Sequence, residues 1–204
     1  IRKNYKNKYD TTIILNNVDK LSLPYITDNQ VDQKKLFSKG SIQNYDLQEE
    51  NILILKNFFD TNQIDYFIDC GTLLGAIREG NIIRGDQDAD FHVSTNSLQK
   101  LRNNLYKLEK LGFISFRNGN TWMSMSLLRK GEYIDIYNHF KNTPDFPIEL
   151  DNYPFLGTQF KIPKYYDDWL TEFYGNWRKP ASDKGPGNWQ NGMKSYLKKH
   201  SIQK

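Results

Sequence analysis

The segment that decides the fold runs Gly71-Thr72-Leu73-Leu74-Gly75-Ala76-Ile77-Arg78 and is followed by Asp86-Gln87-Asp88-Ala89-Asp90. The stretch from Gln63 to Cys70 precedes it and is typical of a short strand. Residues 73–78 predict a short helix, and residues 86–93 alternate as a second strand does. Strand, glycine turn, helix and acidic strand in this order indicate a mixed α/β arrangement.

The three aspartates of the acidic strand form the most informative cluster. In a strand, residues i and i+2 point to the same face about 6.6 Å apart, so Asp88 and Asp90 project together, with Asp86 just before them. Carboxylates held this close repel each other unless a cation lies among them. Their oxygens suit a hard cation such as Mg²⁺, Mn²⁺ or Ca²⁺.

Three interpretations of the cluster compete. A calcium loop of the EF-hand type needs Gly at its sixth position and Glu at its twelfth, which are Phe91 and Ser97 here. A solvated acidic turn without a ligand is the second interpretation. The third is a metal site that handles phosphate, where carboxylates and substrate phosphates share Mg²⁺.

The surrounding sequence favours the phosphate-handling site. Gly71 allows a ligand to approach the backbone closely, and the helix that follows offers N–H groups and a positive dipole end to a phosphate. Downstream, Asp135 lies among apolar neighbours in Tyr133-Ile134-Asp135-Ile136-Tyr137, where a charge is costly without a partner. A Gly-Thr turn, a D-x-D strand and a third aspartate on a neighbouring strand form the layout of a nucleotidyltransferase-type site.

Periodicity and turn residues indicate the remaining elements. Helices are expected at residues 46–60, 97–111 and 164–173, the last closed by Gly175. Further strands are expected at residues 113–116, 121–128 and 132–137. Residues 144–160 and the last 25 residues are expected to be irregular, and residues 1–10 to form a loose basic arm. The expectation is one α+β domain over residues 1–204, with a mixed central sheet flanked by helices and a motif core at about 45–180.

Composition excludes several classes of protein. The 204 residues contain 28 Lys and Arg against 24 Asp and Glu, and this net charge of +4 is too small to imply nucleic-acid binding by itself. No stretch approaches the roughly 20 apolar residues of a membrane span. The single cysteine, Cys70, excludes a disulfide framework and a cysteine-based zinc cluster. The histidines, His92, His139 and His200, lack metal-ligand spacing.

The two quoted segments resemble the signature of the LicD/fukutin family, which is close to GTLLGA-x-R-x-x-x-x-I-P-W-D-x-D-x-D. A second block is similar to the family's "F-x-G…P…L…YG…W" tail and comprises Phe155-Leu156-Gly157, Ile162-Pro163, Leu170, Tyr174-Gly175 and Trp177. Together the blocks span roughly residues 64–180. The resemblance implies a nucleotidyltransferase-like fold.

The same resemblance implies a reaction. Family members transfer a phospho-substituent, such as phosphocholine or ribitol phosphate, from a CDP-activated donor to a sugar hydroxyl, and CMP leaves. The expected cofactor is Mg²⁺ or Mn²⁺, and the expected partners are the CDP donor and a glycan or glycolipid acceptor, with no nucleic acid. Bacterial relatives imply a cytoplasmic location, whereas fukutin-type relatives imply the Golgi lumen with an anchor outside this chain.

The family match implies roles for the three aspartates of the acidic strand, and a mechanistic hypothesis adds roles for four further residues. Asp88 and Asp90 are the expected metal ligands, and Asp86 is a further ligand or a carboxylate behind them. Asp135 is expected to complete the metal site or to accept the proton of the acceptor hydroxyl. Gly71 and Thr72 would present N–H groups and a hydroxyl to phosphate. Arg78 would supply a cation.

One departure concerns the residues before the first aspartate. The family's Pro-Trp is replaced by Arg84-Gly85, which adds a cation and removes an aromatic ring. Recognition of the donor head group therefore does not carry over. Arg84 is expected to contact phosphate or to pair with Asp86.

Other residues have plainer interpretations. Cys70 and His92 are interpreted as packing residues, and Tyr174 and Trp177 as residues that hold the last helix. His139 is a weaker candidate for a general base. Two other functions stay open: transfer of a nucleoside monophosphate to a small molecule or RNA, and a non-catalytic module that binds glycan or nucleic acid.

Overall fold

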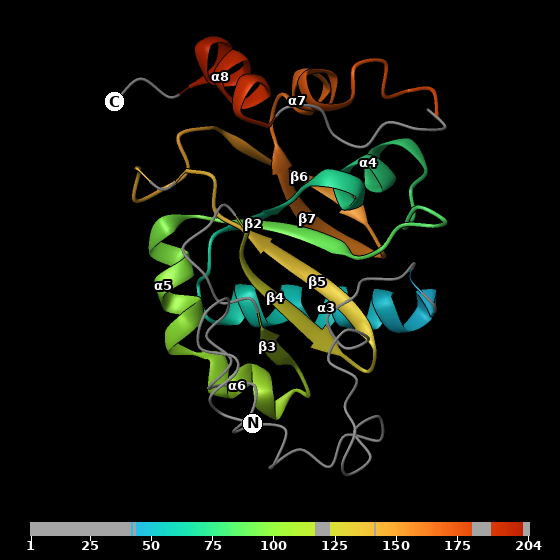
Figure 1. Cartoon of the computed structure of the whole chain (residues 1–204), viewed down its shortest axis with the longest axis vertical. Helices are drawn as coiled ribbons and strands as arrows, with labels where there is room; N and C mark the ends of the chain where they lie inside the picture. Colours follow the sequence, from blue (N-terminus) through green and yellow to red (C-terminus); the bar gives the residue numbers. More distant parts are fainter. Residues whose placement is uncertain (1–41, 43, 117–122, 141, 181–188, 202–204) are drawn as a thin grey trace, which may run out of the picture.

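The computed structural model describes residues 42, 44–116, 123–140, 142–180 and 189–201. Its main sheet has five strands in the order β1-β2-β5-β4-β3 (Figure 1). The strands are β1 (Tyr66–Ile68), β2 (Ala89–Val93), β3 (Ile114–Phe116), β4 (Met123–Arg129) and β5 (Glu132–Tyr137). Strands β2 and β5 run parallel and the other pairs are antiparallel, so the sheet is mixed, as expected from the sequence.

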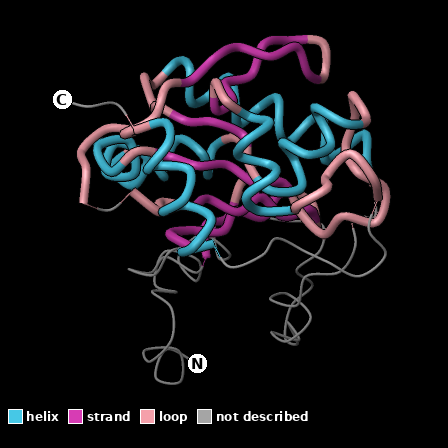
Figure 2. Tube along the Cα trace, turned by 90° about the horizontal axis from the view of Figure 1, so that it is seen from above, coloured by secondary structure: helices cyan, strands magenta, loops and turns pink. Residues whose placement is uncertain are grey.

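The helices lie on either side of the strands (Figure 2). They are α3 (Tyr45–Thr61), α4 (Cys70–Arg78), α5 (Thr95–Asn103), α6 (Leu105–Lys110), α7 (Tyr166–Tyr174) and α8 (Trp189–His200). Helix α3 packs on β5 through an apolar face that includes Ile52, Leu55 and Phe59. Helices α4 and α7 lie at one end of the molecule and α6 at the other (Figure 1). None of the described helices is long and apolar enough to cross a membrane.

The two central strands set the position of the site. Every residue of β2 and β5 is buried, and their parallel register pairs Asp90 with Asp135. Parallel strands buried on both faces are normally continuous apolar runs, so paired aspartates there are exceptional. The strand expected at residues 132–137 is confirmed, and β5 begins and ends at these residues.

Three sequence expectations about elements are wrong. Residues 144–160 contain a hairpin of β6 (Leu150–Phe155) and β7 (Thr158–Pro163), which lies beside β1. The expected single helix at 97–111 is two helices, α5 and α6, which meet at Asn104. The irregular tail contains α8, where Gly192 lets the helix approach the Phe173 ring of α7: a Cβ there would lie 2.7 Å from that ring. Residues 1–10, expected to form the basic arm, and residues 121–122, expected to begin a strand, lie outside the described residues.

Gly75 provides a test of how α4 packs. A Cβ at Gly75 would lie 2.5 Å from the backbone oxygen of Asn81, which is fixed by the loop after the helix. We expect Gly75→Ala to lower the free energy of unfolding by about 2–3 kcal/mol, as overpacking against backbone does. Urea denaturation measures this. Gly80→Ala is the control: it faces open space at φ +65° and should cost only about 1 kcal/mol. Equal losses in the two variants would contradict the packing described.

Candidate active site

Three buried carboxylates meet at the centre of the sheet. Asp90 on β2 and Asp135 on β5 are register partners, and Asp88 lies one residue before β2. One carboxylate oxygen from each lies within 4.8 Å of the other two. That spacing lets a single cation contact all three, and oxygen donors of this kind suit Mg²⁺ or Mn²⁺. The sequence expectation that these three residues come together is confirmed.

The Asp135 carboxylate is oriented by hydroxyl groups. Ser126 on β4 donates a hydrogen bond of 2.5 Å to its Oδ1, and the Tyr137 hydroxyl lies 3.5 Å from its Oδ2. Burial raises the pKa of Tyr137 far above its ordinary value, and the Asp90 carboxylate adds to the rise. The phenol therefore stays protonated at neutral pH and faces the carboxylates as a donor.

Helix α4 begins beside the carboxylates. It starts at Cys70, earlier than the sequence indicated, and its N-cap is Asp69, which accepts a hydrogen bond of 2.7 Å from the Cys70 N–H. Gly71 and Thr72 therefore lie in the first turn, whose N–H groups have no carbonyl partner within the helix. The Thr72 hydroxyl oxygen accepts a bond of 2.8 Å from the Asp90 N–H, which fixes the helix start against β2.

Asp86 lies over the helix start and outside the group of three. Its Oδ1 accepts a hydrogen bond from the Gln87 N–H, and its Oδ2 would be 2.2 Å from a Cβ placed on Gly71. Glycine is thus needed at position 71 because the Asp86 carboxylate occupies the space that a side chain at this position would fill. A role for Asp86 in metal binding stays a prediction.

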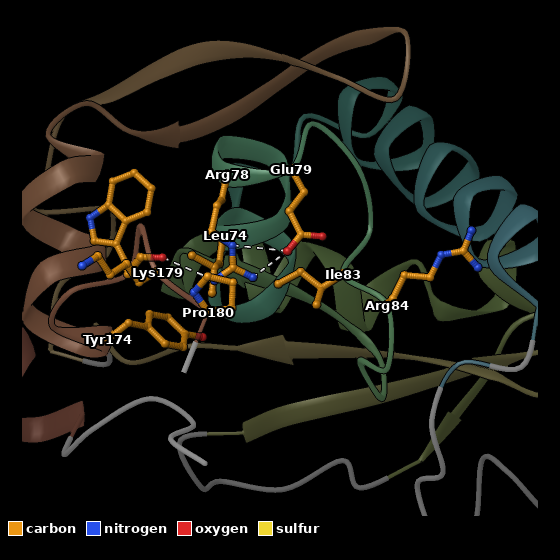
Figure 3. Close-up of a pocket in the computed structure, with 9 residues that line it drawn as sticks. Leu74, Arg78, Glu79, Ile83, Arg84, Tyr174, Lys179 and Pro180 are labelled. Carbon is orange, nitrogen blue, oxygen red and sulfur yellow. Dashed lines mark hydrogen bonds and ion pairs between the residues drawn. The ribbon is translucent and has the colours of Figure 1, made fainter. Parts of the chain in front are cut away.

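The two arginines near the site point in different directions (Figure 3). Arg78 bonds Glu79 through Nε and Nη2, at 3.2 and 2.6 Å, and donates from Nη1 to the Trp177 carbonyl at 3.3 Å. Arg84 is directed toward α3, with its guanidinium 5.0 Å from the centre of the Tyr45 ring. Contacts of either arginine with phosphate stay predictions.

Residues 63–183 match the family described as LicD/FKTN/FKRP, nucleotidyltransferase domain. The match covers more than half of the chain and includes the three carboxylates and α4. The chain belongs to the LicD/FKTN/FKRP family. This membership supports a transferase of the LicD/nucleotidyltransferase type.

Two curated relatives are longer than this LicD-family chain. An uncharacterized protein of Rickettsia prowazekii is 32% identical over 88 residues, which cover 43% of this chain and 32% of the relative. An uncharacterized protein of Rickettsia typhi is 26% identical over 170 residues, which cover 76% of this chain and 53% of the relative. The LicD-family chain thus aligns with between a third and about half of the length of these relatives.

Solved structures with a similar chain course include two antibiotic-modifying enzymes. The lincosamide antibiotic adenylyltransferase LnuA, bound to lincomycin, is 16% identical with a TM-score of 0.45, covering 71% of this chain and 92% of that one. ANT(2'')-Ia in complex with adenylyl-2''-tobramycin is 16% identical with a TM-score of 0.47, covering 74% and 86%.

A buried polar network in the LicD-family domain was not foreseen from the sequence. Asp69 accepts a bond of 2.8 Å from the Trp169 Nε1–H, and its Oδ2 lies 2.9 Å from the His92 Nδ1. The His92 Nε2 lies 3.3 Å from the His139 N–H and accepts from it, so the proton of a neutral His92 is on Nδ1 and faces Asp69. The sequence contained one signal for this role of Asp69, namely its position just before the start of a helix.

The remaining candidates surround this network. His92 is buried, as the packing interpretation requires, and the His139 ring lies 4.6 Å from it and stacks on Tyr137. Burial raises the pKa of the Cys70 thiol well above its ordinary value, and the nearby carboxylates add to the rise, which favours the protonated thiol. A general-base role for His139 stays a prediction.

Proposed function

We propose that this chain is a metal-dependent transferase that moves a phospho-substituent from a CDP-activated donor to a hydroxyl of a glycan or glycolipid and releases CMP. Phosphocholine and ribitol phosphate are examples of the transferred group. The observation that carries the proposal is the buried group of Asp88, Asp90 and Asp135 beside the first turn of α4. The family match supports the transferase class.

The three carboxylates fit a divalent cation. They are buried and close together, and such a group of like charges is costly in a protein interior unless a cation balances it. We assign Mg²⁺ or Mn²⁺ because all three ligands are hard oxygens. The bound cation would supply Lewis-acid neutralisation of the donor's diphosphate.

The chain's own groups would position the substrates. The N–H groups of Gly71 and Thr72 can donate to a phosphate oxygen at the positive end of α4. Arg78, two turns along the same helix, offers a cation to the same donor. Asp135, oriented by Ser126, would complete the cation's ligands or accept the proton of the acceptor hydroxyl. Phosphoryl transfer depends mostly on this positioning and charge neutralisation.

A thermal-shift panel tests the donor class. CDP-choline, CDP-ribitol, CDP-glycerol and nucleoside triphosphates are each added with and without Mg²⁺. We expect at least one CDP compound to stabilise the chain in a Mg²⁺-dependent way, by about 2.7 kcal/mol at one hundred times its Kd. If no CDP compound does so, the proposal fails. Stabilisation that survives EDTA would instead support a non-catalytic binding module.

Product analysis separates the proposed reaction from nucleotide addition. A donor labelled separately in the cytidine and in the head group is incubated with candidate glycan acceptors. We expect the head group and its phosphate on the acceptor and free CMP in solution. The nucleotide on the acceptor would show that the chain is a nucleotide-adding enzyme.

A further inference from the structure

Asp88 differs from the other two carboxylates of the site in how its backbone is held. Asp90 and Asp135 are register partners in the parallel strands β2 and β5, so the sheet fixes their distance. Asp88 lies in the loop between α4 and β2 and belongs to none of the described strand pairs. Its carboxylate is nevertheless buried and close to the other two. Contacts outside the sheet must therefore hold this loop in place.

The start of α3 contacts three consecutive residues of the loop. The Tyr45 hydroxyl accepts a hydrogen bond of 2.7 Å from the Gly85 N–H. The guanidinium of Arg84 lies 5.0 Å from the centre of the Tyr45 ring, and Figure 3 shows this arginine directed toward α3. Just before the helix, the Ile42 N–H donates a bond of 2.8 Å to the Asp86 carbonyl. The loop is thus bound at successive residues directly before the carboxylate site.

The same end of α3 is tied to strand β5. The Asn44 N–H donates a bond of 2.9 Å to the Glu132 carboxylate, and the Gln48 side chain donates one of 2.7 Å to the Tyr133 carbonyl. Both acceptors belong to the first two residues of β5, the strand that carries Asp135. Glu132 and Gln48 are buried, so water competes little for these bonds. The start of α3 therefore links this strand to the loop before β2.

Gly85 explains why the loop needs an external contact. Its φ is +88°, a value that glycine adopts readily but with a large loss of backbone freedom. A Cβ there would meet open space, so neighbouring side chains do not confine the residue. The bond to the Tyr45 hydroxyl supplies the restraint. Arg84 and Gly85 replace the family's Pro-Trp, and Tyr45 lies outside the matched residues 63–183, so the family signature does not contain this contact.

We propose that Tyr45 is a positioning residue of the cation site, because its bond to Gly85 fixes the loop that carries Asp88. The Asp88 carboxylate is thereby held against the two carboxylates of the sheet before a cation binds. Tyr45 acts through the backbone of residues 85–88 and supplies no ligand atom. Loss of the restraint weakens cation binding without removing a charge, because the ligand must then be ordered during binding. This inference rests on the proposed function, since it concerns the cation which that function requires.

Tyr45→Phe tests the inference, because it removes the hydroxyl and keeps the ring beside Arg84. We expect calorimetric titration with Mn²⁺ to show about fivefold weaker binding, the effect of one net hydrogen bond. Hydrogen exchange at the Gly85 N–H should be about fivefold faster. The melting temperature should fall by no more than about 4 °C. Tyr106→Phe is the matched control: its exposed ring also lies beside cations, on α6 at the other end of the molecule, and all three values should stay at wild type.

The EPR spectrum of bound Mn²⁺ distinguishes positioning of a ligand from a general loosening of the fold. Its line shape depends on the ligands around the ion. Tyr45→Phe should therefore change the spectrum in the same direction as Asp88→Asn does, and Tyr106→Phe should leave it unchanged. Wild-type Mn²⁺ affinity with an unchanged spectrum in Tyr45→Phe would overturn the inference. Weaker binding with an unchanged spectrum and a melting temperature lowered by 10 °C or more would overturn it as well, because Tyr45 would then support only the fold.

The inference and the proposed function fail through different results. If no CDP compound binds, the proposed function is wrong, while the comparison of Mn²⁺ affinities still decides the role of Tyr45. If CDP compounds bind in a Mg²⁺-dependent way and Tyr45→Phe keeps wild-type Mn²⁺ affinity, only the inference is wrong. A wild-type chain that binds no Mn²⁺ would overturn both.

Discussion

Asp88→Asn should strongly slow transfer and yet make the metal-free chain more stable. Asp88, Asp90 and Asp135 place three carboxylate oxygens within 4.8 Å of one another in a buried site. Removing one charge relieves repulsion in the metal-free chain, and we expect a higher melting temperature without metal. Loss of several kcal/mol of charge stabilisation should lower the transfer rate by about a thousandfold.

Two measurements separate this result from simple damage to the fold. Thermal unfolding with EDTA and with Mg²⁺ should show a metal-dependent rise in wild type and little or none in Asp88→Asn. Calorimetric titration with Mn²⁺ should show weakened binding. Asp151→Asn, which changes an exposed aspartate on β6, should behave as wild type in both. A variant that keeps wild-type Mn²⁺ affinity would show that the three carboxylates are not a metal site.

The carboxylate group was predictable because its signals are local. Alternation in a strand places Asp88 and Asp90 on one face, and an aspartate between isoleucines indicates a buried charge with a partner. Local patterns alone do not place the strand of Asp135 next to that of Asp90, because β3 and β4 come between β2 and β5 in the chain, whereas in the sheet β5 lies between β2 and β4. The nucleotidyltransferase-type layout, inferred from the Gly-Thr turn, the D-x-D strand and the third aspartate, supplied that neighbourhood as an expectation.

The missed elements lacked local signals. Pro154 and Gly157 made the β6–β7 hairpin resemble a loop, although a two-stranded hairpin leaves edge positions where proline is tolerated. Helix α8 contains Gly192, a poor helix former, which is explained by its contact with Phe173. Such residues are chosen by tertiary packing, which a periodicity argument does not contain.

Asp69 is the clearest case of a residue whose importance depends on distant partners. Its side chain is 1% exposed and accepts hydrogen bonds from the Cys70 N–H and the Trp169 Nε1–H, while its other oxygen faces the His92 Nδ1. Asp69→Ala would leave these buried donors without an acceptor. We expect the free energy of unfolding to fall by about 3–5 kcal/mol, and the melting temperature by about 10 °C.

Urea and thermal unfolding of three variants, Asp69→Ala, Asp69→Asn and Asp65→Ala, measure how much stability each contact of the Asp69 carboxylate provides. Asp69→Asn keeps one acceptor oxygen but turns an amide group toward a neighbouring donor, so it should lose about half as much stability as Asp69→Ala. Asp65→Ala removes an exposed carboxylate four residues away and should stay within about 0.5 kcal/mol of wild type. Equal stability of Asp69→Ala and Asp65→Ala would contradict the network.

The same variants show whether Asp69 positions the phosphate site. Asp69 caps α4, and the Thr72 hydroxyl joins the first turn of that helix to the Asp90 backbone. Asp69→Asn should therefore weaken Mg²⁺-dependent binding of a CDP donor while its Mn²⁺ affinity stays near that of wild type, because the three carboxylates remain in place. A parallel loss of both affinities would mean that Asp69 supports the whole sheet and not the helix start. If Asp69→Asn keeps both the CDP-donor affinity and the Mn²⁺ affinity, Asp69 serves only to stabilise the contact between α4 and α7.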